Sequence, residues 1–89
     1  MNSIHKQKVL VIGGTGSLGN ALVKRYLENN ELYLYSRDES KHWSMQIDYK
    51  NHNNLNFIIG NIKDRDKIRQ TLTRHNFDII ILAAAMKHI

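Results

Sequence analysis

The fold of this chain is decided by the stretch Gly13-Gly14-Thr15-Gly16-Ser17-Leu18-Gly19. It contains the spacing Gly14-x-Gly16-x-x-Gly19 and separates an apolar run, Val9–Ile12, from a segment with helical periodicity. In such a strand–turn–helix unit the first glycines permit a tight turn, the middle one lets a pyrophosphate approach the main chain, and the last lets the helix pack on the strand. The N–H groups at the helix start then face the phosphates. The stretch predicts a dinucleotide-binding turn, with a glycine turn that binds no ligand as the alternative.

Strand and helix patterns alternate outward from this turn. Short apolar runs bounded by glycine or polar residues predict strands at residues 9–12, 32–35, 55–59 and 78–85. Apolar residues at helical spacing predict helices at residues 18–28, 39–50 and 64–75. Asp64 is the expected N-cap of the last helix, because its side chain can accept a hydrogen bond from a first-turn N–H group. The side chains expected to face the sheet from the last two helices are Trp43, Met45, Ile47, Ile68 and Leu72.

This order of elements predicts an α/β fold of the Rossmann type. Strands that alternate with helices join by right-handed crossovers into a parallel sheet with helices on both faces. The expected architecture has three layers and the strand order 3-2-1-4, an incomplete half of a doubly wound fold plus the strand that opens the second half. The 89 residues have room for one small domain. We therefore expect residues 1–89 to form the N-terminal portion of an NAD(P)-binding Rossmann domain, with no substrate domain.

The chain is modestly basic, with 13 Lys and Arg residues against 8 Asp and Glu residues. Lys63, Arg65, Lys67 and Arg69 alternate, but a two-residue step scatters side chains around a helix and forms no stripe. A nucleic-acid partner is therefore not expected, and binding through this surface would show a steep salt dependence. The positive potential also suits a phosphate-rich small ligand.

Cysteine and histidine usage argues against a metal site. The chain has no cysteine, and none of its 5 histidines lies three or four residues from another. We expect these histidines to be ordinary surface residues. The longest apolar run, residues 79–86, is far shorter than the ~20 residues of a membrane span. We expect a soluble, cytoplasmic protein with no membrane partner.

The end of the second predicted strand bears on the choice of dinucleotide. An acidic side chain there holds a free ribose 2′-hydroxyl, whereas an arginine pairs with a 2′-phosphate. Ser36 and Arg37 occupy this position, Asp38 follows it, and Lys41 is a candidate second contact. This order favours NADP over NAD; the alternative for Arg37 is a solvated loop charge.

Two later strand ends are candidates for the rest of the cofactor pocket. Asn61, which precedes Ile62 after the third strand, can both donate and accept hydrogen bonds at an adenine ring. The small residues 83–85 leave space for a nicotinamide ribose between the first and fourth strands. Plain close packing explains the same three alanines, and the sequence leaves both interpretations open.

Four stretches of this chain resemble the extended short-chain dehydrogenase/reductase family. The resemblance is closer to the N-terminal part of inverting UDP-N-acetylglucosamine 4,6-dehydratases and related polysaccharide-biosynthesis enzymes. The stretches are residues 13–19, Tyr35-Ser36-Arg37-Asp38-Glu39, Gly60-Asn61-Ile62-Lys63-Asp64 and Ala83-Ala84-Ala85-Met86-Lys87-His88. The resemblance covers nearly all of this chain but only the first part of such an enzyme.

The resemblance implies an NADP cofactor and a nucleotide-sugar reaction. In the family a hydride leaves sugar C4, water is eliminated across C5 and C6, and the hydride returns to C6. The family usually has Asp where this chain has Asn61, so an amide replaces an acceptor-only carboxylate at the adenine contact. The glycine turn and the resemblance together assign to the cofactor Gly13, Gly14, Thr15, Gly16, Ser17, Leu18, Gly19, Ser36, Arg37, Asp38, Glu39, Ser40, Lys41, Asn61, Ile62, Ala83 and Lys87.

Such enzymes also use a Tyr-x-x-x-Lys pair, in which the lysine lowers the pKa of the tyrosine, and this chain has no such pair. The residues four positions after Tyr26, Tyr33, Tyr35 and Tyr49 are Asn30, Arg37, Glu39 and Asn53. No catalytic residue is assigned within the chain. Lys87 is either a contact beside the nicotinamide or a solvated lysine.

We therefore expect an NADP-binding N-terminal fragment, or a truncated relative, of a nucleotide-sugar 4,6-dehydratase or epimerase that is not catalytic alone. A UDP-sugar is expected as a partner only when the rest of the enzyme is present. The alternative is a non-catalytic interaction module. Its fourth strand, an apolar edge that invites pairing, would join a second copy in a homo-oligomer or a separately encoded remainder.

Overall fold

The strand β1 (Lys8–Ile12) lies at the centre of the fold because Val9–Ile12 are apolar and buried. The computed structural model describes residues 6–13 and 16–83 of the chain. In it β1 lies between β2 (Glu31–Ser36) and β4 (Ile79–Leu82), and β3 (Leu55–Ile59) flanks β2. All neighbouring strands are parallel, in the order β3-β2-β1-β4.

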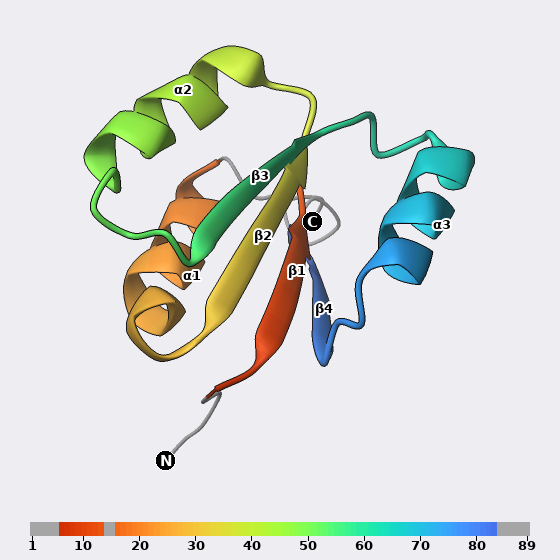
Figure 1. Cartoon of the computed structure of the whole chain (residues 1–89). Helices are drawn as coiled ribbons and strands as arrows, with labels where there is room; N and C mark the ends of the chain where they lie inside the picture. Colours follow the sequence, from red (N-terminus) through yellow and green to blue (C-terminus); the bar gives the residue numbers. More distant parts are fainter. Residues whose placement is uncertain (1–5, 14–15, 84–89) are drawn as a thin grey trace.

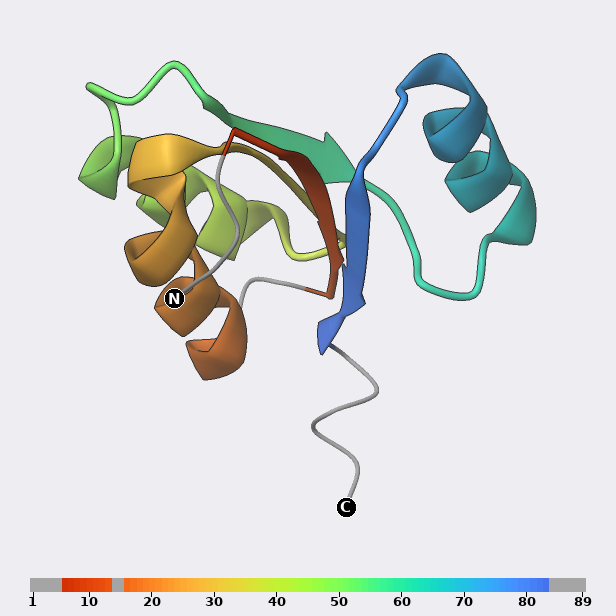
Figure 2. The same cartoon turned by 90° about the horizontal axis from the view of Figure 1, so that it is seen from below.

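Helices cover both faces of this sheet (Figure 1, Figure 2). α1 (Ser17–Tyr26), the short 3-10 helix η1 (Leu27–Asn29) and α2 (Glu39–Asp48) lie on one face. α3 (Arg65–Arg74) lies on the other. The three-layer Rossmann-type architecture and the strand order predicted from the sequence are confirmed.

The alternation of side chains along β1 supplies two separate apolar clusters, one on each face of the sheet. The cluster on the α1 and α2 face is built from Val9, Val11, Val23, Leu27, Leu32, Leu34, Met45, Leu55 and Ala83. The cluster on the α3 face has Leu10, Ile12 and Tyr35 at its centre, with Ile68 of α3 packed against it. Because each fully buried side chain of this size contributes roughly 1.5–3 kcal/mol, the larger cluster anchors α1 and α2 more firmly than the smaller one anchors α3.

The predicted apolar face of α2 is wrong for two of its three residues. Trp43 and Ile47 are 65% and 53% exposed, whereas His42 and Met45 are 2% and 3% exposed. Asp38 caps α2 and so fixes where its first turn begins, and the helical phase that follows turns His42 and Met45 toward the sheet. The prediction that all the histidines lie on the surface is therefore wrong at His42.

In α3 the predicted N-cap is confirmed, because the Asp64 side chain accepts a hydrogen bond from the Lys67 N–H at 3.1 Å. The inward face is confirmed at Ile68, but Leu72 is 37% exposed, contrary to the prediction. Thr71 is buried instead, and its hydroxyl donates to the Lys67 carbonyl at 2.8 Å. This local bond satisfies a polar group whose burial would otherwise be unfavourable.

The strand β4 is shorter than predicted and forms an edge of the sheet. Asp78 precedes the strand, and its carboxylate accepts a hydrogen bond from the Lys8 N–H at 2.8 Å. Residues 84–89, including the last part of the predicted strand, lie outside the described residues. Within residues 6–13 and 16–83, β4 pairs with β1 alone, and its Ile80 and Leu82 are 51% and 46% exposed.

Candidate functional site

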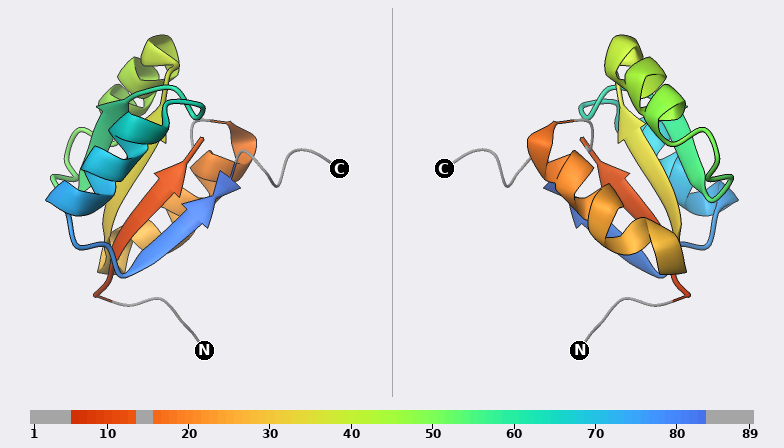
Figure 3. Two further views of the ribbon diagram at one scale, coloured as in Figure 1. Left: turned by 90° about the vertical axis from the view of Figure 1, so that its right-hand side faces the viewer. Right: turned by 90° about the vertical axis from the view of Figure 1, so that its left-hand side faces the viewer.

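The carboxyl ends of the four strands meet at one edge of the sheet, because all neighbouring strands are parallel (Figure 3). Open α/β sheets bind ligands at this edge, in the crevice where the connections from neighbouring strands diverge. At this edge or in the first turns of α1 and α2, the structure brings together Gly13, Gly16, Leu18, Gly19, Ser36, Arg37, Asp38, Glu39, Ser40, Lys41, Asn61, Ile62 and Ala83. Ser17 begins α1, while Gly14, Thr15 and Lys87 lie outside the described residues.

Gly13 opens the turn between β1 and α1. Its φ of 78° lies in the left-handed region, where a side chain is unfavourable. Its N–H donates to the Tyr35 carbonyl at 2.6 Å, so the end of β1 is held beside the end of β2. The positive φ therefore favours glycine at the first position of the predicted turn.

The N-terminus of α1 differs from those of α2 and α3. Gly16 is the N-cap of α1 and supplies no side-chain hydrogen bond, and the first turn holds no acidic residue. In α2 and α3 an aspartate side chain caps the helix, and a further acidic residue lies in the first turn. A helix start without such groups offers its N–H donors and partial positive charge to an anion. The start of α1 is therefore the candidate anion-binding position at this edge.

In the loop after β2, Arg37 is exposed and Asp38 accepts hydrogen bonds. The Asp38 carboxylate accepts hydrogen bonds from the Lys41 N–H at 3.1 Å and from the Ser40 hydroxyl at 2.9 Å. These bonds, the first more than the second, lower the pKa of Asp38. The Ser36 hydroxyl in turn accepts from the Asp38 N–H at 3.2 Å, which tightens the loop. The carboxylate is occupied in capping α2, while the Arg37 side chain faces solvent.

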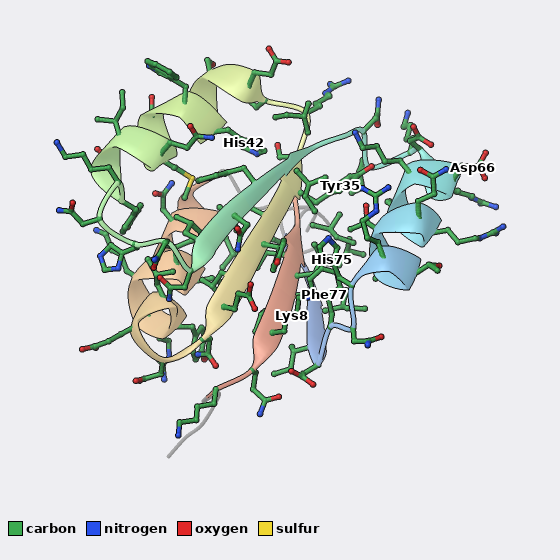
Figure 4. All side chains as sticks on the ribbon, in the orientation of Figure 1. Lys8, Tyr35, His42, Asp66, His75 and Phe77 are labelled. Atoms are coloured by element: carbon green, nitrogen blue, oxygen red, sulfur yellow. The ribbon has the colours of Figure 1, made fainter. Side chains whose placement is uncertain are left out.

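The end of β3 is fastened to β2 through Tyr35, a contact that sequence reasoning missed. Tyr35 is 1% exposed and lies between the sheet and α3, where its hydroxyl donates to the Asn61 carbonyl at 2.9 Å (Figure 4). A β-carbon on Gly60 would stand 2.4 Å from this hydroxyl oxygen, so the close approach requires glycine. Burial, followed by the charge of Asp64, raises the pKa of Tyr35, which keeps the phenol protonated as a donor. The sequence signal for this contact was the glycine that ends the strand.

His42 is a second residue whose environment sequence reasoning missed. It lies between α2 and the sheet (Figure 4), with its ring centroid 5.0 Å from that of Phe57. Neither ring nitrogen has a hydrogen-bond partner among the described residues. Burial lowers the pKa of His42, against smaller opposing effects from the charges of Asp38 and Glu39. His42 is thus a neutral packing residue beneath the first turns of α2.

Ala83 follows β4 with no exposed surface and belongs to the cluster around Val9 and Val11. Its side chain is close-packed, which is one of the two arrangements that the sequence left open. Asn61 is exposed, and its Oδ1 accepts a hydrogen bond from the Lys63 N–H at 2.9 Å. The asparagine side chain therefore shapes the turn after β3 at the same edge.

A polar cavity of about 630 Å³ lies at the opposite end of the sheet, between the amino ends of the strands. It is lined partly by Asn30 and Asn54, whose amide groups hold the main chain together. Asn30 Nδ2 donates to the Tyr26 carbonyl at 2.8 Å, and Asn54 Nδ2 donates to the Asn30 carbonyl at 2.8 Å. These groups fasten the amino ends of the strands, far from the glycine turn.

Within residues 6–13 and 16–83, no group of three or more His, Cys, Asp or Glu side chains is placed to hold a metal ion. None of the helices in these ranges has the length and apolar character of a membrane span.

The strand order and the glycine turn define a Rossmann-type domain. A family model described as "Polysaccharide biosynthesis protein" matches residues 9–89, and the chain belongs to this family. It is 37% identical over 86 residues to the inverting UDP-N-acetylglucosamine 4,6-dehydratase of Campylobacter jejuni, covering 93% of this chain and 25% of that enzyme. It is also 37% identical over 87 residues to the UDP-glucose 4-epimerase of Rickettsia typhi, covering 91% of this chain and 25% of that enzyme. The chain thus spans about a quarter of the length of these curated relatives.

Solved structures show the same fold. The X-ray structure of Pen from Bacillus thuringiensis matches 85% of this chain and 24% of its own, with a TM-score of 0.77 and 26% identity. The UDP-N-acetylglucosamine 4-epimerase of Methanobrevibacter ruminantium matches 86% of this chain and 24% of its own, with a TM-score of 0.68 and 23% identity. The second likeness concerns the fold alone.

Proposed function

We propose that this chain is the NADP-binding N-terminal region of a nucleotide-sugar 4,6-dehydratase or epimerase of polysaccharide biosynthesis. The observation that carries the proposal is the uncapped start of α1 next to an exposed Arg37, at the carboxyl ends of the paired strands β1 and β2. A helix start suits the pyrophosphate, and a guanidinium suits a 2′-phosphate. The family of the chain and the enzymes it resembles agree with this chemistry.

The residues of the carboxyl edge fit such a cofactor. The main chain from Gly13 to Gly19 binds the pyrophosphate, because N–H groups at a helix start that follows a glycine turn suit phosphate groups. Arg37 pairs with the 2′-phosphate, and Lys41 adds a second exposed cation in the first turn of α2. Asp38 already accepts two hydrogen bonds in its cap, which disfavours it as a ribose ligand and so disfavours NAD.

Asn61 and Ile62 form the adenine side of the proposed pocket. Both are exposed at the end of β3, and the asparagine amide can donate to a ring nitrogen. Main-chain atoms near Ala83, and Lys87 beyond the described residues, complete the proposed site at the nicotinamide side. The tie between Tyr35 and the Asn61 carbonyl holds the adenine contact in place.

When bound, NADP supplies a hydride acceptor and donor for chemistry at a sugar carbon. The residues of this chain bind and orient the cofactor but provide no acid/base pair. Tyr35 is buried and donates to a main-chain carbonyl, and no tyrosine of the chain is followed four residues later by lysine. We infer that the catalytic groups and the UDP-sugar site lie outside these 89 residues and that the chain alone is not catalytic.

A second function, as an interaction module, is favoured by the exposed edge of β4. Ile80 and Leu82 are about half exposed on a strand that has one neighbour in the described structure, so pairing with the remainder of a larger enzyme or a second copy would bury them. Self-pairing predicts a dimer in light scattering that Ile80→Lys abolishes. A monomer at every concentration would contradict self-pairing through β4.

The proposed cofactor is tested by titrating the purified chain with NADPH and with NADH and following the fluorescence of the reduced nicotinamide. Saturable binding with a preference for NADPH is expected. Arg37→Asp should weaken NADPH binding by about tenfold or more, because a charged hydrogen-bond pair contributes about 1.5–3 kcal/mol. Arg69→Asp, the same change at an exposed residue of α3, is the matched control and should bind as the native chain does. Equal affinity for both dinucleotides would contradict the NADP assignment, and no binding of either would contradict the proposed function.

A further inference from the structure

The side chain of Lys67, in the first turn of α3, reaches back across the connection between β3 and α3. Its ammonium group donates a hydrogen bond to the carbonyl of Ile59, the last residue of β3. The main-chain N–H of the same lysine donates to the Asp64 cap at 3.1 Å. Lys67 therefore spans residues 60–64, the segment that carries Asn61 at the carboxyl edge of the sheet (Figure 1).

Two contacts from β2 hold the same segment on its other side. The Gly60 N–H donates to the Ser36 carbonyl at 3.0 Å, and the Tyr35 hydroxyl donates to the Asn61 carbonyl at 2.9 Å. The contact made by Lys67 comes instead from a helix that begins after the turn. The turn is thus fastened both to the sheet and to α3, and loss of the lysine donor would leave it fastened to β2.

The stability of α3 does not by itself favour a lysine at this position. The partial positive charge at a helix N-terminus disfavours a cation in the first turn. The Lys67 side chain is nevertheless partly buried, whereas those of Lys63 and Arg65 nearby are exposed. A long side chain held in one arrangement also loses rotamer freedom. The bond to the Ile59 carbonyl is the contact that offsets these costs.

We propose that Lys67 is a positioning residue for the dinucleotide, which holds the turn of Asn61 in the arrangement that meets the adenine ring. The inference rests on the proposed function. Lys67 acts through the main chain, since its ammonium fixes the end of β3 and so orders the turn before the cofactor arrives. A turn that is already ordered loses less conformational entropy on binding, which raises the affinity. The alternative is a lysine that only covers a main-chain acceptor of β3, which lies at an edge of the described sheet.

The experiment compares the full chain with three variants in the fluorescence titration with NADPH. Lys67→Met keeps an unbranched side chain but has no donor, and it should weaken binding about three- to tenfold. Lys67→Arg keeps donors that can reach a carbonyl, so most of the affinity should return. Lys63→Met removes one positive charge from the same connection without removing the contact, and it is the matched control. Its effect should stay below about twofold, because exposed charges interact weakly in water.

Two further measurements test the route by which Lys67 acts. In the free chain, ¹⁵N relaxation should show that the amides of residues 60–62 are more mobile in Lys67→Met than in the native chain, on the picosecond-to-nanosecond timescale. In the Asn61→Ala background, Lys67→Met should cost less NADPH affinity than it does in the native chain, because both changes act on one contact.

Three results would overturn the positioning role while leaving the NADP assignment intact. The first is native affinity for NADPH in Lys67→Met. The second is equal weakening by Lys67→Met and Lys63→Met, which would assign the effect to charge alone. The third is unchanged mobility of residues 60–62 in Lys67→Met, which would mean that the lysine only covers an acceptor of β3.

A native chain that binds neither NADPH nor NADH would contradict the proposed function, and the positioning role with it. Circular dichroism shows whether each variant is folded. Should Lys67→Met lose its fold, Lys67→Gln, whose side chain is shorter, takes its place in every comparison.

Discussion

Tyr35 and Gly60 approach so closely that a β-carbon on residue 60 would stand 2.4 Å from the tyrosine hydroxyl oxygen. Tyr35 is 1% exposed and packs among Leu10 and Ile12, so its ring has little room to withdraw. The same approach lets the hydroxyl reach the Asn61 carbonyl. A packing requirement inside the α3 face thus sets the position of a residue at the proposed adenine contact.

Gly60→Ala should therefore destabilise the chain by about 1–3 kcal/mol, the usual effect of overpacking a well-filled core. Urea unfolding followed by circular dichroism measures the change. The double variant Tyr35→Leu/Gly60→Ala should be less destabilised than the sum of the single variants, because leucine removes the clashing ring atoms. An unchanged free energy of unfolding in Gly60→Ala would show that the ring moves at little cost.

Burial of His42 predicts a stability that falls in mild acid. Its pKa in the folded chain lies below the ordinary 6.5, so the unfolded chain binds the proton more readily. The contribution of neutral His42 to the free energy of unfolding is present above pH 6.5 and declines as the pH falls below that value. The pKa of Asp38 is lowered from 3.8, so protonation of this carboxylate reduces the stability only in more acidic solution.

Urea unfolding at about pH 7.5 and about pH 5.5 brackets the ordinary titration range of histidine and measures this effect. His42→Phe should remove the decline, because phenylalanine takes up no proton and can pack against Phe57. His52→Gln, at an exposed histidine, should leave the decline in place. A decline of equal size in His42→Phe would contradict the assignment.

The sequence was sufficient for the order and pairing of the strands and insufficient for the phase of α2. Continuous apolar runs such as Val9–Ile12 fix buried parallel strands, and right-handed crossovers then leave few topologies. In α2 the apolar pattern is weak, and Trp43 and Ile47 suggested the wrong inward face. The cap at Asp38 and the packing of Met45 determine the face that is buried.

The candidate site was predictable where it depends on local chain geometry. The glycine turn and the exposed Arg37 follow from the residues between consecutive elements. The tie from Tyr35 to Gly60 and Asn61 joins residues far apart in sequence, so the glycine at the end of β3 was a signal that did not identify its partner. The burial of His42 in α2 depends on Phe57 of β3, so local sequence patterns did not predict it.

Asp38→Asn should leave the preference for NADPH over NADH unchanged. Asparagine is an effective N-cap, so α2 and the loop that carries Arg37 should keep their conformation. The ratio of the two dissociation constants, measured by the fluorescence titration, is the test. If Asp38→Asn selectively weakened NADH binding, the aspartate would be a ribose ligand as well as a cap.

Leu10 and Leu82 differ in burial, so truncating each of them tests how unequally the α3 face of the sheet is covered. Leu10 is fully buried, so Leu10→Ala should destabilise the chain by about 2–5 kcal/mol. Leu82 is 46% exposed on the edge strand, and Leu82→Ala should cost under about 1 kcal/mol. Thermal unfolding compares the two variants at equal concentration. Equal losses would mean that β4 is covered in solution, for example by a second copy.

Binding of NADP at the carboxyl edge of the sheet is tested most directly by NMR. NADP⁺ is added to the ¹⁵N-labelled 89-residue chain, and amide shifts are followed residue by residue. The largest shifts are expected at Gly13, Gly16, Gly19 and Arg37, with smaller ones at Asn61. The amides around Asn30 and Asn54, at the opposite end of the sheet, should not shift. Shifts confined to that opposite end, or no shifts with a folded spectrum, would contradict the claim that the carboxyl edge binds NADP.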